Sequence, residues 1–124
     1  MAELKTGSTV NGSTILTDSA PKFIEVQETV VAVPSLDLDL ENGTVFTKTI
    51  TGNSTFTFSN PAASGTASSF TFILNSGSNT VTWPGSVDWA AATAPDLTGV
   101  NILGFTTTDG GTTWYGVVGA LGAS

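Results

Sequence analysis

Carboxylates are the side chains of this sequence best able to do chemistry, because it contains no histidine and no cysteine. Their absence excludes a Ser-His-Asp triad, a thiolate nucleophile, a Cys/His zinc site and a disulfide framework. Glycoside hydrolysis stays open, since it needs only two acids that flank the bond. Asp88, Asp96 and Asp109 are the carboxylates that follow Glu41. Their spacing does not indicate one cleft, and the turn favoured by Asp109-Gly110 explains Asp109. We therefore predict that the chain is not an enzyme.

A second group of acids follows a strand pattern. Asp37, Asp39 and Glu41 lie at i, i+2 and i+4, on one strand face and roughly 7 Å apart in successive steps. Calcium takes six to eight oxygens, so these three would need further ligands from a loop or a neighbouring chain. We interpret them as an exposed acidic strand face that is partly balanced by Lys48. The prediction is no metal and no cofactor.

Aromatic rings near the C-terminal end suggest a different site, because such rings stack on the apolar faces of sugars while carboxylates bind the hydroxyls. Trp83 and Trp114 lie at positions of the expected strands whose side chains point inward, which is typical of core residues. Trp89 falls in an expected loop and fits either a core or a binding role. The candidate glycan-binding residues are Asp88, Trp89, Asp109 and Tyr115.

Charge limits the possible partners. The chain carries ten acidic residues against three lysines, a net charge of −7. This cannot form the basic surface that neutralises phosphates, so nucleic acid and anionic membrane surfaces are poor partners. The first ten residues contain no apolar run, and no long apolar segment follows. We expect neither a signal peptide nor membrane insertion.

Period-two alternation predicts the elements that position these residues. Strands are expected at 23–33, 36–40, 44–51, 54–59, 69–75, 79–83, 100–107 and 112–118. Asn42-Gly43 and Gly52-Asn53 offer reversals between neighbouring strands. A hairpin around Asp109-Gly110 would set Phe105 opposite Trp114. Residues 84–98 are expected to be an irregular connection, with a single helical turn at 89–92.

About eight short strands without an amphipathic helix predict an all-β fold, an antiparallel β-sandwich or jelly roll. A trimeric β-prism is the competing architecture. Residues 23–124 are expected to form one β-domain. Residues 1–22 fit neither the sandwich nor the prism. We interpret them as an extended arm, and the alternative is a frayed terminus.

Several separate motifs carry a family resemblance across residues 35–118. They include Ile50-Thr-Gly-Asn-Ser-Thr-Phe-Thr-Phe58, Val81-Thr-Trp-Pro84 and Asp109-Gly-Gly-Thr-Thr-Trp-Tyr115. In order and spacing they resemble a β-module found at the outer ends of bacteriophage tail fibres and in other proteins of the virion surface. The chain lacks the long repetitive stem of a fibre, which favours a stand-alone decoration or appendage subunit.

The resemblance implies a non-enzymatic structural protein on the exterior of a phage particle, made in the host cytoplasm. We expect it to self-associate as a trimer and to dock on a major capsid or tail protein. The alternative is a glycan-binding adhesion module that recognises the host surface. The residues expected to anchor the arm are Val10, Ile15, Leu16 and Phe23.

Overall fold

The computed structural model describes residues 9–10, 13–14 and 24–123. The described elements are strands and one short 3-10 turn, which confirms the all-β prediction. They are β1 (Thr9–Val10), β2 (Ser13–Thr14), β3 (Val30–Ala32), β4 (Asp37–Asp39), β5 (Val45–Thr49), β6 (Ser54–Thr55), β7 (Thr57–Ser59), β8 (Ser68–Gly77), β9 (Val81–Thr82), β10 (Val87–Asp88), η1 (Ala90–Ala92), β11 (Gly99–Thr107) and β12 (Trp114–Ala123). The turn η1 lies where a helical turn is expected from the sequence.

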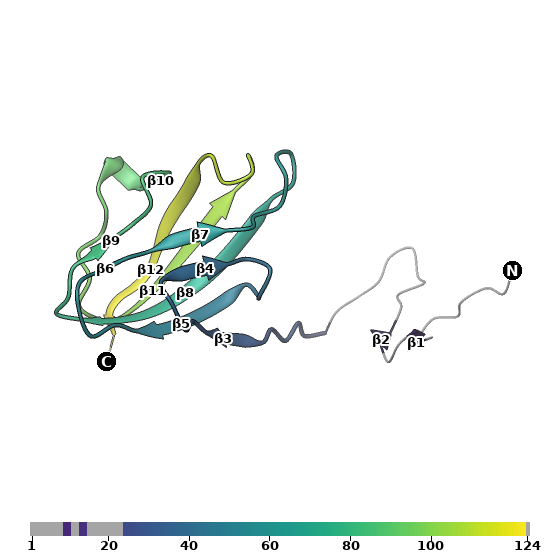
Figure 1. Cartoon of the computed structure of the whole chain (residues 1–124), viewed down its shortest axis with the longest axis horizontal. Helices are drawn as coiled ribbons and strands as arrows, with labels where there is room; N and C mark the ends of the chain where they lie inside the picture. The colour runs from purple at the N-terminus through teal and green to yellow at the C-terminus, as the bar shows by residue number, and fades with distance from the viewer. Residues whose placement is uncertain (1–8, 11–12, 15–23, 124) are drawn as a thin grey trace, which may run out of the picture.

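Six strands form one sheet in the order β10-β12-β11-β8-β5-β3 (Figure 1). β3, β5 and β8 run parallel to one another, and β10 runs parallel to β12. β11 is antiparallel to both of its neighbours, β8 and β12. The sheet is therefore mixed, and the prediction of antiparallel pairing throughout is wrong. Side chains alternate with the same period in parallel and antiparallel strands, so the alternation does not report strand direction.

Shorter strands form a second layer over one face of this sheet. They make two parallel pairs, β4 with β7 and β6 with β9. β6 and β7 are the two halves of one extended run, residues 54–59. The N–H of Phe56 donates to the carbonyl of Thr82 at 2.9 Å, whereas the N–H of Thr57 donates to the carbonyl of Leu36 at 3.0 Å. The first half of the run thus pairs with β9 and the second half with β4.

Between β3 and β8 the chain crosses repeatedly from one layer to the other. It passes from β3 in the sheet to β4 in the second layer, returns to β5, crosses to β6 and β7, and returns to β8 (Figure 1). The reversals at Asn42-Gly43 and Gly52-Asn53 are therefore connections between layers rather than the hairpins expected from sequence. Parallel neighbours such as β5 and β8 cannot be joined by a tight hairpin and require a crossover.

Aromatic rings fill the space between the layers. Phe58 of the second layer makes edge-to-face contacts with Phe70 and Trp114 of the sheet, with ring centroids 5.0 and 5.3 Å apart. Burying such rings is the main favourable contribution to a core of this size. The core position expected from sequence for Trp114 is confirmed, whereas Trp83 is partly buried and packs against the core. The buried apolar residues are Val33, Leu38, Phe46, Ile50, Phe56, Phe70, Phe72, Leu74, Trp89, Leu103, Phe105 and Trp114.

The last hairpin has a different register from the one expected. Phe105 lies opposite Gly116, and Thr106 lies opposite Tyr115. Residues 108–113 form the loop, which is longer than the two-residue turn predicted at Asp109-Gly110. Trp114 pairs with Val87 of β10. The prediction that Phe105 faces Trp114 across the ladder is therefore wrong, although both rings reach the same core.

The N-terminal predictions fall mostly on residues that the structure does not describe. In the predicted arm, β1 pairs antiparallel with β2, and Val10 lies opposite Ser13. Ile15, Leu16 and Phe23 lie outside the described residues. The strand expected at 23–33 forms a ladder only at β3, and residues 24–29 precede it without ladder pairing.

Candidate functional site

Trp89 lies in the core, with 8% of its surface exposed. Its ring contacts Trp83 and Phe105, with centroids 5.6 and 5.5 Å away. It also lies directly over Gly116, where an added Cβ would stand 2.6 Å from the ring. The missing side chain of Gly116 thus creates the space that the indole occupies. A ring held in this way offers no open face on which a sugar could stack.

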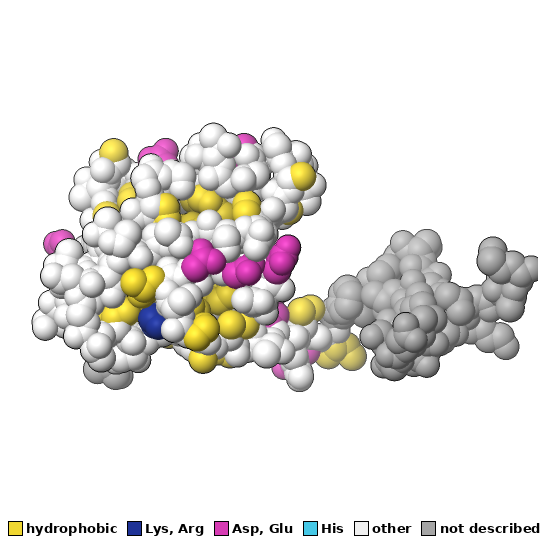
Figure 2. Space-filling view, viewed as in Figure 1, with side chains coloured by type: hydrophobic (Ala, Val, Ile, Leu, Met, Phe, Trp, Pro, Cys, Tyr) yellow, Lys and Arg dark blue, Asp and Glu magenta, His cyan; other side chains and the backbone are white. Residues whose placement is uncertain are grey.

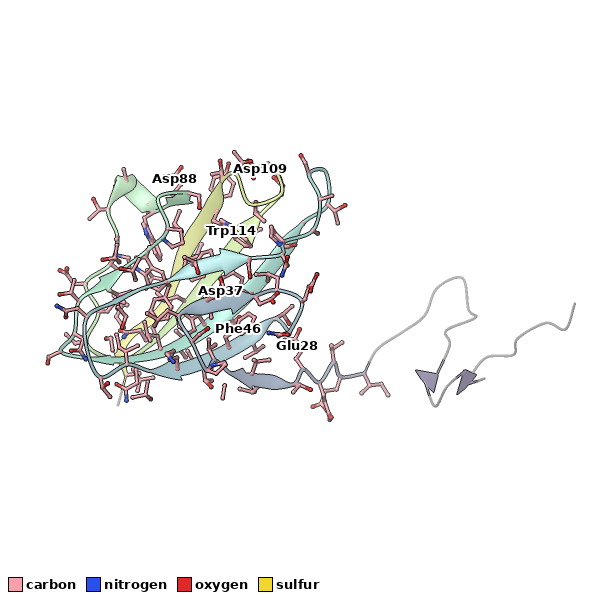
Figure 3. The ribbon with its side chains drawn as sticks, in the orientation of Figure 1. Glu28, Asp37, Phe46, Asp88, Asp109 and Trp114 are labelled. Carbon is pink, nitrogen blue, oxygen red and sulfur yellow. The ribbon has the colours of Figure 1, made fainter. Side chains whose placement is uncertain are left out.

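Asp88 and Tyr115 are brought together by the sheet. They are partners in the parallel pairing of β10 with β12, and both are exposed, Tyr115 by 53%. Asp109 belongs to the loop between β11 and β12, at the same end of the molecule as Asp88 (Figure 3). Of the four residues expected to bind a glycan, the structure therefore pairs two, places a third in a nearby loop and places Trp89 in the core.

The carboxylate of Asp109 organises its own loop. Its Oδ1 accepts hydrogen bonds from the Thr113 N–H and the Thr107 hydroxyl, both at 2.9 Å. The Thr107 hydroxyl in turn accepts a bond from the Gly111 N–H at 3.0 Å. The bond from Thr113 has the largest effect and lowers the pKa of Asp109 below its ordinary value, against a smaller opposing effect of desolvation. Charge on this carboxylate therefore stabilises the folded loop.

We expect Asp109→Asn to lower the melting temperature at neutral pH. A lowered pKa in the folded state means that the charged form contributes stability above the unfolded-state pKa of about 3.9. That contribution is lost as the pH falls through the lower folded-state pKa. The difference in melting temperature between the wild type and Asp109→Asn should therefore shrink on acidification. Asp88→Asn, which removes the same charge at an exposed position, is the control. A difference that is constant from pH 7 to strong acid would contradict this role.

The acids of the expected strand 36–40 are engaged in hydrogen bonds between β4 and β7. The hydroxyls of Thr57 and Ser59 donate to the carboxylate of Asp37 at 2.7 and 2.6 Å. The side-chain amide of Asn60 donates to Asp39 at 2.9 Å and, as the largest cause, lowers the pKa of Asp39. Figure 2 shows acidic side chains gathered over this part of the second layer. Among the described residues, no three acidic side chains are placed to hold a metal ion together.

Lys48 does not balance these acids. Its ammonium donates to the carbonyl of Val33 at 3.0 Å. The hairpin expected to bring Lys48 opposite these acids does not form, because β4 and β5 belong to different layers. The acidic face of the second layer thus keeps its negative charge.

The largest feature that the site predictions missed is the outer face of the six-stranded sheet, the side away from the second layer. We call it the open face. Its side chains form rows across the strands, and two neighbouring rows contain no charged residue. One row is Val30, Val45, Thr71, Gly104 and Val117, and the next is Ala32, Thr47, Ile73, Ile102 and Ala120. The charge-free stretch between Lys48 and Asp88 supplies only Thr71 and Ile73 to these rows, so it did not reveal this face in the sequence.

The open face is shallow rather than deeply hollowed. A hollow of about 330 Å³ lies around Gly104, between Thr71, Thr106 and Val117, and Glu28 also lines it. An added Cβ on Gly104 would stand 2.9 Å from a methyl group of Val117, so the absent side chain forms the floor of this hollow. Such a face can cover another protein surface, whereas a small molecule would remain mostly exposed on it.

No helix among the described residues has the length and apolar character that crossing a membrane requires. Comparisons of the chain with protein-family models, with curated protein sequences and with solved structures find no match.

Proposed function

We propose that this chain is a non-enzymatic structural protein of the exterior of a bacteriophage particle, where it decorates the capsid or the tail. It self-associates as a trimer and docks on the major capsid or tail protein. The observation that carries the structural role is the open face: two adjacent rows of apolar and hydroxyl side chains, uncharged across five strands. Burying such a surface against protein requires no desolvation of charge.

The virion context rests on the motif resemblance across residues 35–118. The run 50–58 and the motif at 81–84 supply β6, β7 and β9, which form part of the second layer. Residues 109–115 supply the loop that ends at Trp114. The motifs therefore belong to one packed unit, as expected if the whole module, rather than a chance run of threonine and phenylalanine, carries the resemblance.

The two packed layers support a β-sandwich as the finer fold class. A jelly roll is built from antiparallel Greek-key connections. The parallel neighbours β3, β5 and β8 do not provide them. We therefore propose a sandwich in which parallel strands cross between layers, followed by the antiparallel pair β11 and β12.

The arm completes the proposed attachment. Val10, Ile15, Leu16 and Phe23 anchor residues 1–22 on a neighbouring protein, by adding backbone hydrogen bonds to an unpaired strand edge. β3, the next strand along the chain after residues 1–22, is an edge strand of the six-stranded sheet.

Electron microscopy of purified virions from the host that carries this reading frame tests the proposal. Gold-labelled antibody against the chain should mark the exterior of the particles. Particles that remain unlabelled while the chain stays in the soluble lysate would contradict the virion role. Hydrolysis of a polysaccharide by the purified chain would contradict the non-enzymatic role.

Glycan binding is the second candidate, and the pairing of Asp88 with Tyr115 favours it. If these residues hold a sugar, Tyr115→Ala should weaken binding on a glycan array by roughly tenfold or more, because the stacking surface of one ring is lost. The melting temperature should stay unchanged, since Tyr115 is half exposed. Asp96→Asn, at an exposed loop position, is the control and should bind as the wild type. A chain that binds no glycan, or Tyr115→Ala that binds as well as the wild type, would exclude this site.

A further inference from the structure

The open face is uncharged over most of its area, although the chain as a whole carries a net charge of −7. The charged groups near it lie at its margins and are Glu28, Lys48 and Asp88. The acids Asp37 and Asp39 lie in the second layer, on the other side of the core. Charge is thus segregated between the two sides of the molecule.

This segregation favours a second copy of the same chain as the partner. Two copies that met through their acidic layers would bring like charges together, which is unfavourable. Copies that meet through their open faces, as three copies arranged around one axis would, keep those layers apart. A strongly charged partner would find no complementary charge in the two central rows. The face therefore fits a surface that is equally neutral, and its own copy is one.

The size of the face matches what a stable contact between copies needs. Each strand residue covers about 3.3 Å along its strand, and neighbouring strands lie about 4.8 Å apart. The residues of the six strands together therefore cover roughly 600 Å² in the plane of the sheet. Accessible area exceeds projected area, and a standard interface buries about 800 Å² per partner. The apolar side chains available to it are large and exposed, with Val117 at 61%, Tyr115 at 53% and Ile102 at 37%.

The apolar pattern also continues beyond the edge of the sheet. Ile24 and Val26 precede β3 and are exposed by 106% and 69%, with Glu25 between them and Glu28 two residues before Val30. Both lie in the unpaired residues 24–29, so no strand of their own sheet lies beneath them. Exposed apolar side chains that extend a neutral sheet face are typical of a surface that another protein covers.

We infer that the open face of the six-stranded sheet is the surface through which copies of this chain associate. This inference rests on the proposed self-association and names the surface responsible. Its centre is the row that contains Gly104 and Val117. The shallow hollow at Gly104, which Glu28 lines on one side, accepts a side chain of a neighbouring copy.

Charge substitution at the centre of the face tests the inference. Val117→Glu should raise the dissociation constant of self-association by at least about 30-fold, because it buries a carboxylate without a partner. Thr55→Glu places the same charge on an exposed strand position of the second layer and should associate as the wild type. Light scattering over a concentration series measures association, while circular dichroism and thermal melting show whether each variant is folded.

Thiol accessibility provides a readout that does not depend on dissociation. Since the chain has no cysteine, Val117→Cys and Thr55→Cys each carry one thiol. A bulky maleimide should label Val117→Cys more slowly as the protein concentration rises and Thr55→Cys at a constant rate. Equal labelling of the two thiols under conditions in which the chain is associated would overturn the inference. Association of Val117→Glu as tight as that of the wild type would also overturn it.

These outcomes are separable from the virion proposal. A wild-type chain that is monomeric at high micromolar concentration overturns the inference, while antibody labelling of particles still decides the virion role. A chain that associates through the open face but is absent from particles supports the inference and contradicts the virion role.

Discussion

Replacing Trp89 by alanine is expected to lower the free energy of unfolding by about 3–5 kcal/mol, the usual cost of removing a buried aromatic ring. Total stabilities of small domains are about 5–15 kcal/mol, so much of the fold's stability is at stake. The indole contacts Trp83 and Phe105 and lies over Gly116. Gly116 has no side chain that could refill the space, so a cavity remains. Urea unfolding followed by circular dichroism measures the loss.

Tyr115→Ala is the matched control, because it removes an exposed ring from the position next to Gly116, and both variants are measured at a protein concentration at which the chain is monomeric. Its effect should stay within about 0.5 kcal/mol. A Trp89→Ala midpoint close to that of the wild type would contradict the core position of Trp89.

A double-mutant cycle between Trp89 and Gly116 sharpens this test. Gly116→Ala puts a methyl group 2.6 Å from the indole, which is well inside van der Waals contact. It should cost about 1–3 kcal/mol in the wild type through overpacking. In the Trp89→Ala background the same methyl group enters the cavity and should cost less. Equal costs in both backgrounds would mean that the two residues do not touch.

Replacing Asn101 by leucine is expected to cost at least about 3 kcal/mol, because each buried polar group left without a partner costs about 1–3 kcal/mol. Asn101 is completely buried. Its amide N–H groups donate to the Leu74 carbonyl, the Ser76 hydroxyl and the Gly99 carbonyl at 3.2, 3.1 and 3.0 Å. Its amide oxygen accepts a bond from the Gly122 N–H at 3.2 Å.

The reason for this polar residue in the core is the irregular ladder around it. The register shifts once against β8, between Gly99 and Val100, and twice against β12, between Val100 and Leu103. Gly99 and Gly122 both adopt positive φ, at 57° and 61°. Backbone groups at these irregularities lack regular partners, and the Asn101 side chain supplies them.

Asn53→Ala is the control for the Asn101 variant. Asn53 is exposed, and its side-chain oxygen accepts one bond, from the Thr80 N–H at 2.8 Å. Its loss should cost about 1 kcal/mol or less. Hydrogen exchange should show faster opening of β11 and β12 in Asn101→Leu. Equal unfolding midpoints for the two variants would contradict a stabilising network at Asn101.

Local patterns predicted the strands and much of the core. The alternation of Phe70, Phe72 and Leu74 reported their burial correctly, because a side chain's phase within a strand depends only on its position along the chain. Pro34 and the Gly-containing pairs also marked the ends of strands. The missed feature at this level was Asn101, since a single asparagine within an apolar run resembles a surface residue.

The pairing of the strands, and the layer in which each strand lies, could not be predicted from local patterns. Asn42-Gly43 permits a reversal, but it does not determine whether the next strand pairs with the previous one or lies in another layer. That choice depends on which neighbour buries the most apolar area, here the packing of Phe46 against the ring of Phe70. The antiparallel sheet and the hairpin before Lys48 failed for this reason, whereas the Phe105–Trp114 register failed because the connecting loop spans residues 108–113.

By itself the sequence determined that the chain is all-β, acidic and without histidine or cysteine, because these properties depend on residue types and on neighbours along the chain. Only the tertiary structure decided that Trp89 belongs to the core and that two uncharged rows adjoin on one open face. Those rows join residues as distant as Val30 and Val117, which become neighbours only when the six strands pair in their final order.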